Sequence, residues 1–180
     1  MGQPKEPRPS KLFMSIIFAT DSMLGQGMED LGLAFGRIDS VSKRFPFDLT
    51  QYYAEEIGPR LFRNFISVEP LIPPASLPDI KLATNRLEKK YATPQGKRQL
   101  NIDPGYLCLA HVILATTKGY SHRPYLRDGI YADVSLIYRN GSFRPLEWTY
   151  PDYRQEDVIT FFNQLRERYI EALERSPLPC

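Results

Sequence analysis

The sequence is poor in the residues and runs that mark secreted and membrane proteins. It has only two cysteines among 180 residues, and no apolar run approaches the about 18 to 20 residues that a membrane crossing needs. No apolar stretch of a signal peptide follows its basic start. Cys108 lies in an apolar run and Cys180 is the last residue, so we expect reduced thiols rather than a disulfide. These absences predict a cytoplasmic protein with no membrane partner.

Signature motifs of the common enzyme classes are missing as well. After its first apolar run the chain reads DSMLGQGMEDLG, which has no lysine and cannot form the phosphate loop G-x-x-x-x-G-K-[ST]. Its glycines also miss the G-x-G-x-x-G spacing of a dinucleotide-binding turn. There is no H-E-x-x-H, C-x-x-C or G-x-S-x-G, so the common zinc, redox and α/β-hydrolase sites lack their residues. The sequence therefore predicts no metal site and leaves any cofactor or reaction unassigned.

Positive charge is concentrated in one stretch, residues 81–127. It holds nine Lys and Arg against two acids, a balance of +7, in a chain of formal net charge +2. Such a segment can focus an anion such as a phosphate or carboxylate. It is a poor match to a nucleic-acid surface, because Lys81, Arg86, Lys89 and Lys90 are predicted to form the solvated face of a helix. The basic segment is therefore interpreted either as a solvated face of the protein or as a site for a small anionic ligand.

The first half of the chain alternates strand and helix patterns. Proline-rich residues 1–10 predict a flexible arm, followed by a single globular domain over residues 11–176. The first two elements expected are a buried strand over 12–19 and a helix capped by Asp21 or Ser22 and ended by Gly36. An edge strand or extended loop over 41–49, which contains Pro46, and a strand over 62–68 follow. A helix with an S-x-x-D capping box at Ser76 then ends near Tyr91 and leads to a strand over 98–102. This order predicts an α+β protein with a ferredoxin-like α/β sandwich core.

The next segment, residues 104–118, fits two structures. Asp103 can cap a helix with Pro104 at its first position and Gly119 beyond its end. The run LCLAHVILATT suits a buried strand equally well. We predict the helix and keep the strand as the alternative.

A hairpin and a helix are expected to complete the fold at its C-terminal end. Alternation predicts a strand over residues 130–139, and Asn140-Gly141 is a type I′ turn signal that leads into a second strand over residues 142–148. An amphipathic helix then begins near Glu156 and is stopped by Pro177.

Candidate site residues gather in residues 101–154, which hold both histidines, the only tryptophan and seven of the eleven tyrosines. The loop TTKGYSHRPYLRDG places polar side chains between two apolar segments, where a rigid scaffold can present them to a ligand. We predict that Lys118, Arg123, Tyr125 and Tyr131 bind the ligand. His122 and Asp133 are predicted to carry any general acid-base catalysis, because a histidine exchanges protons near neutral pH. The simpler alternative is a solvated loop.

Other polar and aromatic residues have structural interpretations. Asp133 in mid-strand requires a cation such as Arg123, exposure to water, or a role in a site. Asp103 can cap the following segment or, as the alternative, join His122 and Asp133 around a metal. His111, Tyr138 and Trp148 are expected in the core.

Five blocks carry a resemblance to a known family: KEPRPSKLFMSIIFA, FPFDLTQYYAEEIGPRLFRNFISVEPLI, DIKLATNRLE, NIDPGYLCLAHVILATTKGYSHRPYLRDGIYADVSL and WTYPDYR. Together they span nearly the whole chain and resemble the prokaryotic family known as domain of unknown function number 4416. The resemblance implies a single domain and names no activity. The best hypothesis is binding of a nucleotide or phosphorylated metabolite at the loop of Lys118, His122 and Arg123. The alternative is a non-enzymatic interaction module with a tyrosine-rich surface, and the oligomeric state stays open.

Overall fold

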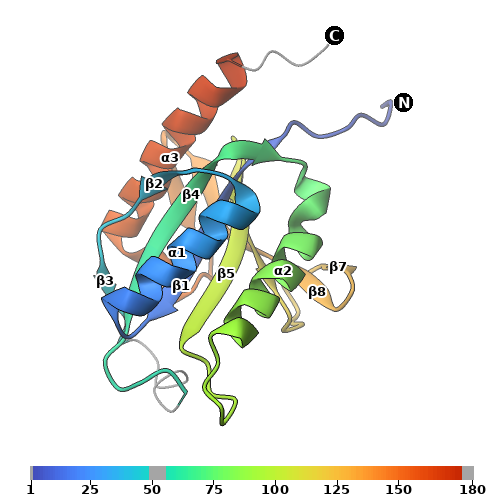
Figure 1. Ribbon diagram of the computed structural model, residues 1–180. Coiled ribbons are helices and arrows are strands. Elements are labelled where there is room, and N and C mark those ends of the chain that lie inside the picture. Colours follow the sequence, from blue (N-terminus) through green and yellow to red (C-terminus); the bar gives the residue numbers. More distant parts are fainter. Residues whose placement is uncertain (1, 49–55, 176–180) are drawn as a thin grey trace.

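The chain folds around one large antiparallel sheet, with helices on both of its faces (Figure 1). The computed structural model describes residues 2–48 and 56–175. The elements of this part are β1 Ser10–Phe18, α1 Asp21–Phe35, β2 Ile38–Val41, β3 Phe45–Pro46, β4 Phe62–Ile72, the 3₁₀ turn η1 Pro74–Ser76, α2 Leu77–Lys90, β5 Leu100–Leu107, β6 His111–Thr116, β7 Tyr125–Arg127, β8 Ile130–Arg139, β9 Ser142–Pro145, the 3₁₀ turn η2 Pro151–Arg154, and α3 Glu156–Arg175. The protein is therefore α+β, as predicted.

Strand order explains why the first apolar run is buried on both faces. The sheet runs β2-β4-β1-β5-β6-β8-β7, with β3 paired to β4 and β9 to β8. Every residue of the central strand β1 is buried. Leu12, Met14 and Ile16 pack with the residues of α1 and α2, whereas Phe13 packs with α3. Because both faces are covered, the strand needs no polar alternation.

Helix α1 has the expected end but a different start. Its N-cap is Thr20, whose side chain accepts a hydrogen bond from the Met23 N–H, and not Asp21 or Ser22. Gly36 ends the helix with a φ of 108°, a conformation that favours glycine. Gly27 has a packing reason, since a Cβ there would lie 2.8 Å from Leu100 Cδ1. A larger residue at this position would therefore require the Leu100 side chain to shift.

Helix α2 ends at Lys90, next to the Tyr91 expected from the sequence, but the predicted capping box is wrong. The Ser76 hydroxyl donates to the carbonyl of Pro73 and makes no cap hydrogen bond to the helix. The 3₁₀ turn η1 precedes α2 directly, so Ser76 has helical rather than extended backbone angles. A capping side chain requires the extended conformation, which explains the difference.

The helix predicted over residues 104–118 is wrong, and the strand alternative holds. β5 continues to Leu107 and turns back into β6, and the two strands pair from Gly105–Leu107 to Val112–Leu114. A Cβ at Gly105 would lie 2.4 Å from the Ile113 carbonyl oxygen and 2.6 Å from Phe13 Cζ. The local Asp-Pro signal was outweighed by this long-range pairing and by the β-branched residues of β6.

The C-terminal part follows the prediction closely. Asn140 and Gly141 have φ values of 51° and 80°, as a type I′ turn requires, and β8 pairs antiparallel with β9 through them. β9 ends at Pro145, earlier than expected, and α3 begins at Glu156. Pro177, which was expected to stop α3, and Leu49, the expected end of the segment over 41–49, lie outside the described residues. None of the helices in the described part combines the length and apolar character of a membrane crossing.

Candidate functional site

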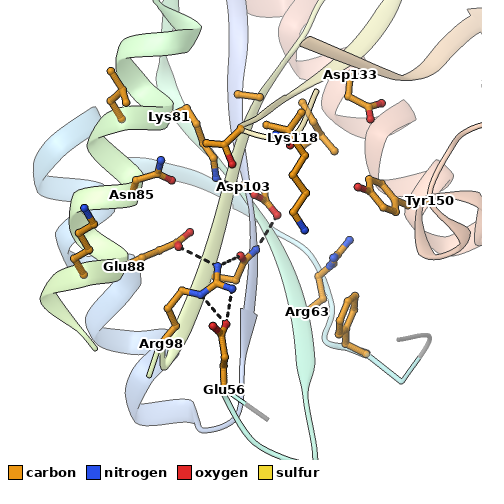
Figure 2. Close-up of a pocket in the computed structure, with 18 of the residues that line it drawn as sticks. Glu56, Arg63, Lys81, Asn85, Glu88, Arg98, Asp103, Lys118, Asp133 and Tyr150 are labelled. Atoms are coloured by element: carbon orange, nitrogen blue, oxygen red, sulfur yellow. Dashed lines mark hydrogen bonds and ion pairs between the residues drawn. The ribbon is translucent and has the colours of Figure 1, made fainter. Parts of the chain in front are cut away.

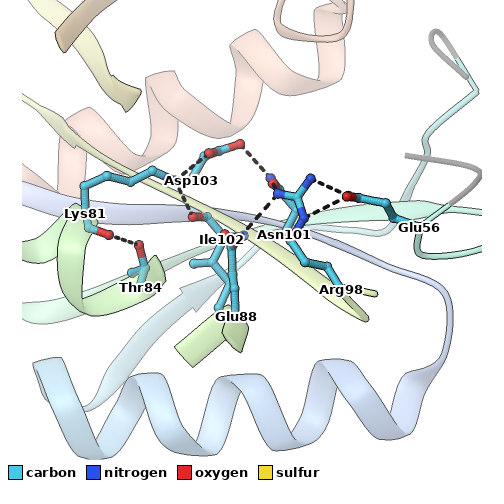
Figure 3. A network of polar contacts seen from close by, with 8 residues as sticks. All are labelled: Glu56, Lys81, Thr84, Glu88, Arg98, Asn101, Ile102 and Asp103. Atoms are coloured by element: carbon cyan, nitrogen blue, oxygen red, sulfur yellow. Dashed lines mark hydrogen bonds and ion pairs between the residues drawn. The ribbon is translucent and has the colours of Figure 1, made fainter. Parts of the chain in front are cut away.

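A gap in the sheet creates the candidate site. β5 pairs with β1 down to Leu100, but its pairing with β6 begins only at Gly105. On the side away from β1, the backbone of Ile102 is satisfied by α2 instead of a strand (Figure 3). Lys81 Nζ donates to the Ile102 carbonyl at 3.0 Å, and the Ile102 N–H donates to Glu88 Oε1 at 2.7 Å. Two helix side chains thus replace the missing strand partner.

A cavity of about 860 Å³ opens at this gap (Figure 2). It lies between α2, the separated parts of β5 and β6, and the segment that leads into η2. Its volume suits a ligand of metabolite size. Its charged lining comprises Arg63, Lys81, Arg86, Lys89, Arg98 and Lys118 together with Glu56, Glu88, Asp103, Asp133 and Asp152. The cavity therefore offers both cations and acceptors to a ligand.

Lys81 and Asp103 form an ion pair at the cavity wall, in which the lysine is buried and the aspartate is partly exposed. Lys81 is only 5% exposed, and its Nζ lies 2.9 Å from Asp103 Oδ1. Asn101 Nδ2 donates to the other carboxylate oxygen at 2.7 Å. Burial would raise the pKa of Asp103, but Lys81 and Asn101 outweigh it and hold the pKa below its ordinary value. Two predictions are therefore wrong: Lys81 is not on the solvated face of α2, and Asp103 caps no helix.

Glu88 and Arg98 are a second pair of charged residues in the lining (Figure 3). Arg98 donates to Glu56 Oε2 at 2.9 Å and to Asn101 Oδ1 at 3.1 Å, and lies 3.5 Å from Glu88 Oε2. Burial raises the pKa of Glu88 above its ordinary value of 4.5, although Lys81 and the Ile102 N–H act in the opposite direction. Glu88 therefore holds a proton to higher pH than an exposed glutamate does.

Arg63 on β4 is a buried cation in the lining of this cavity, and the sequence reasoning missed it. Its side chain is paired with Asp152 of η2 and lies over the rings of Phe47 and Tyr153, at 4.6 and 5.4 Å from their centroids. The residue is 7% exposed, yet its Nε has no hydrogen-bond partner among the described residues. A buried guanidinium donor without a partner is costly unless something else accepts from it. The signal in the sequence was a single charged residue within FRNFISV.

Arg123 holds together the opposite wall of the cavity. Its Nε lies 2.8 Å from Asp133 Oδ2, which is the ion pair that the sequence analysis allowed. Its two Nη atoms donate to the Tyr150 hydroxyl at 2.8 Å and to the Lys118 carbonyl at 3.1 Å. Lys118, Asp133 and Tyr150 all line the cavity. Arg123 itself does not, so it positions the lining without contributing to its surface.

The remaining predicted site residues lie behind this wall or outside it. His122 Nε2 is 3.6 Å from Asp133 Oδ2, and its ring stacks on Trp148 with centroids 5.1 Å apart. Tyr125 and Tyr131 pack edge to face, with centroids 5.3 Å apart. None of these three predicted residues belongs to the cavity lining. Of the six predicted site residues, the structure therefore brings only Lys118 and Asp133 into the cavity.

The three residues expected in the core have mixed outcomes. Trp148 is 40% exposed, and its indole Nε1 donates to the Val134 carbonyl at 2.9 Å. Tyr138 is half-buried and packs against the core below α3, with Arg166 3.7 Å from its ring centroid. His111 is half-buried beside Cys108, whose pKa is lowered by the imidazole and the Ala110 N–H against the effect of burial. Only Tyr138 is thus part of the core, at its edge.

A metal is not indicated by the described residues. No group of three or more His, Cys, Asp or Glu side chains among them is placed to hold a metal ion. Asp103, His122 and Asp133 in particular form no such group. The chemistry that the lining supports is recognition of charge and hydrogen bonding, with Glu88 as the carboxyl group of raised pKa.

Comparison with known proteins gives a family and no activity. A family model described as "Domain of unknown function (DUF4416)" matches residues 8–169, which is most of the chain. No curated protein and no solved structure matches the chain significantly.

Proposed function

Because this chain belongs to the family described as domain of unknown function 4416, whose description states no activity, we propose a function from the cavity itself. The protein binds a small anionic ligand, such as a phosphorylated metabolite, in the cavity between α2 and η2. This proposal keeps the ligand class expected from the sequence and moves its site from the loop to the cavity. Lys118 is the residue common to both.

The observation that carries the proposal is the unpartnered Nε of Arg63. Its guanidinium is paired with Asp152 on one side only, and Nε has no acceptor among the described residues. A phosphate or carboxylate oxygen placed in the cavity would accept from it. Charge-assisted hydrogen bonds of this kind are about twice as strong as neutral ones. Lys118, on the facing wall, is the second cation suited to the same anion.

Arg63 and Lys118 are not proposed as the anion-binding residues merely because they are positively charged. Lys81, Arg98 and Arg63 are all paired with carboxylates, but among these three, within the described part of the chain, only Arg63 also has a buried donor, Nε, without an acceptor. Arg86 and Lys89 also line the cavity, but both are exposed to solvent. Arg63 is therefore the buried anchor of the proposal, and Lys118 is a second cationic side chain in the same lining.

The proposal is tested by thermal unfolding with a panel of inorganic phosphate, citrate, sugar phosphates and nucleotides. A ligand present at 100 times its Kd stabilises a protein by about 2.7 kcal/mol. For a chain of this size that corresponds to a rise in Tm of about 5–10 °C. We expect at least one member of the panel to produce such a rise.

Variants identify the site. Lys118→Met should weaken the binding of the active ligand about tenfold, whereas Lys43→Met, which removes the same charge from an exposed pair with Asp157, should leave it unchanged. Arg63→Lys keeps a charge for Asp152 but lacks Nε, and should weaken binding as well. If no panel member raises Tm, or if Lys118→Met and Arg63→Lys both bind like the parent protein, the proposal is wrong.

The core is also best assigned, as a proposal, to the ferredoxin-like class predicted from the sequence. The strand order β2-β4-β1-β5 supports the assignment. Antiparallel pairing of these strands and the position of α1 and α2 on one face also agree with it.

A second candidate function is protein association through exposed aromatic residues. Tyr120, Tyr125, Leu126 and Trp148 are all at least 40% exposed and lie in or near β7, at one edge of the sheet. Aromatic residues are enriched at protein interfaces. A second copy of the chain is the partner to test first: Tyr120→Ser should lower the mass measured by light scattering at high concentration, while Leu33→Ser on α1 should not. An unchanged mass across a wide concentration range contradicts self-association.

A further inference from the structure

The lining of the cavity contains acceptors as well as cations. Five carboxylates accompany six cationic side chains. A ligand made only of an anionic group would leave these carboxylates facing negative charge, which is unfavourable at short range. The complementary ligand therefore carries hydrogen-bond donors in addition to its anion.

Asp152 is a carboxylate suited to such a donor. Asp103 uses both oxygens, for Lys81 and Asn101. Asp133 also uses both, for Arg123 and the Ser135 hydroxyl. Asp152 pairs with Arg63 through Oδ2, and its Oδ1 has no hydrogen-bond partner among the described residues. A ligand hydroxyl that donates to Oδ1 would lie beside an anion held by Arg63.

Asn85 supplies a second polar group without a structural task. It lies in the interior of α2, where asparagine is unfavourable relative to alanine. Its side chain points from the helix into the cavity (Figure 2) and makes no hydrogen bond within the described part of the chain. A carboxamide both donates and accepts, which matches a hydroxyl group.

An aromatic ring also lines this cavity. Tyr150 lines the cavity and is 45% exposed, while its hydroxyl is held by Arg123 at 2.8 Å. Leu82 and Leu114 add apolar surface to the lining. A ring fixed in this way can pack against the C–H face of a polyol while polar groups bind its hydroxyls.

From these groups we propose that the ligand is a phosphorylated polyol, in the chemical class of the sugar phosphates. Arg63 and Lys118 bind the phosphate, Asn85 and Asp152 Oδ1 bind hydroxyls, and Tyr150 packs on the carbon skeleton. This inference rests on the proposed function, because it requires an anion in the same cavity.

Calorimetric titration with matched probes tests it. The hydroxylated probes are ribose 5-phosphate and glucose 6-phosphate, and butyl phosphate has the phosphate without hydroxyls. We expect at least one sugar phosphate to bind ten times more tightly than butyl phosphate or more. Asn85→Ala should reduce this preference at least fivefold and leave the affinity for butyl phosphate unchanged, since the phosphate contacts remain.

A control variant and the contrary outcomes complete the test. Gln26→Ala on α1 removes a carboxamide from an exposed helix position outside the cavity and should change no affinity. Equal affinities for butyl phosphate and both sugar phosphates would overturn the polyol inference and leave anion binding standing. The same holds if Asn85→Ala preserves the preference for the sugar phosphate. Failure of all three probes and of inorganic phosphate to bind would overturn this inference, and failure of the whole anion panel would overturn the proposed function with it.

Discussion

Lys81 of α2 and Asp103 of β5 form an ion pair 2.9 Å long at the point where β6 leaves the edge of β5. Lys81 also donates to the Ile102 carbonyl, so one side chain joins the helix, the sheet edge and the wall of the cavity. This arrangement makes the stability of the sheet edge and the shape of the cavity depend on the same residues.

Removal of Lys81 is expected to be costly. Lys81→Met leaves the Ile102 carbonyl without its donor and Asp103 without its cation. Loss of one partner of a buried pair costs about 3–5 kcal/mol, and the partial exposure of Asp103 reduces the expected loss to about 2–3 kcal/mol. Urea unfolding followed by circular dichroism measures it. The matched variant Lys90→Met, from a pair whose lysine is exposed, should lose less than about 1 kcal/mol. Equal losses would contradict the structural role of Lys81.

Glu88 predicts a pH dependence of stability. Burial raises its pKa above 4.5, so the folded state holds the Glu88 proton to higher pH than the unfolded state does. The resulting stabilisation is fully present below 4.5 and is lost as the pH rises through the raised pKa. Glu88→Gln cannot titrate and keeps an oxygen for the Ile102 N–H. Its Tm relative to the parent protein should therefore increase between pH 4 and pH 8.

Glu69→Gln is the control of opposite sign. Glu69 is exposed, and its hydrogen bond to Arg37 lowers its pKa. Its small stabilisation is present above 4.5 and is lost as the pH falls through the lowered pKa, so the relative Tm of the variant should fall with rising pH. A relative Tm of Glu88→Gln that falls or stays flat would contradict the burial of that carboxyl group.

Arg123 should affect ligand binding without touching the ligand. It connects Asp133, Tyr150 and the Lys118 carbonyl. Arg123→Ala removes these bonds and leaves Asp133 buried without its main cation, so we expect a loss of about 2–4 kcal/mol in stability and at least fivefold in affinity. Arg123→Lys keeps the charge but not the three-way geometry, and should recover stability more than affinity. Parent-like affinity in both variants, measured by calorimetry, would show that this wall needs no such support.

Two glycine substitutions test the pairing of β5 with β6. At Gly105 a Cβ would lie 2.4 Å from a backbone oxygen of β6, so Gly105→Ala should lose more than about 2 kcal/mol. At Gly25, within α1, nothing lies within 4 Å, and Gly25→Ala should gain about 0.5–1 kcal/mol. Urea titration measures the free energy of unfolding of both variants and of the parent protein. A helix over residues 104–118 would instead make Gly105→Ala neutral or stabilising.

Local patterns in the sequence predicted most elements because each depends on neighbouring residues. Neighbouring residues alone were enough to predict the alternation of apolar and polar residues in β8, the Asn140-Gly141 turn and the apolar stripe of α3. Residues 104–118 could not be predicted in the same way. Their local signals fit a helix and a strand equally, and the choice was made by pairing with β1 and β8.

The candidate site was less accessible to sequence reasoning than the fold. Lys118 was identified because polar residues stood out between apolar segments, and Asp133 because it is an acidic residue in the middle of a predicted strand. Arg63 and Lys81 stood in an apolar strand and on a charged helix, where their burial depends on elements distant in the chain. Asn85 carried no signal at all, since its significance lies in facing a cavity that forms where two strands separate.

The most direct measurement is nuclear magnetic resonance of the Arg63 side chain during a titration with ribose 5-phosphate and inorganic phosphate. The Nε–H signal is assigned by its loss in Arg63→Lys. We predict a saturable downfield shift of this proton, because a phosphate oxygen becomes the acceptor that Nε lacks among the described residues. A phosphate-bearing ligand that saturates the protein while the Arg63 Nε–H signal stays in place would contradict the account.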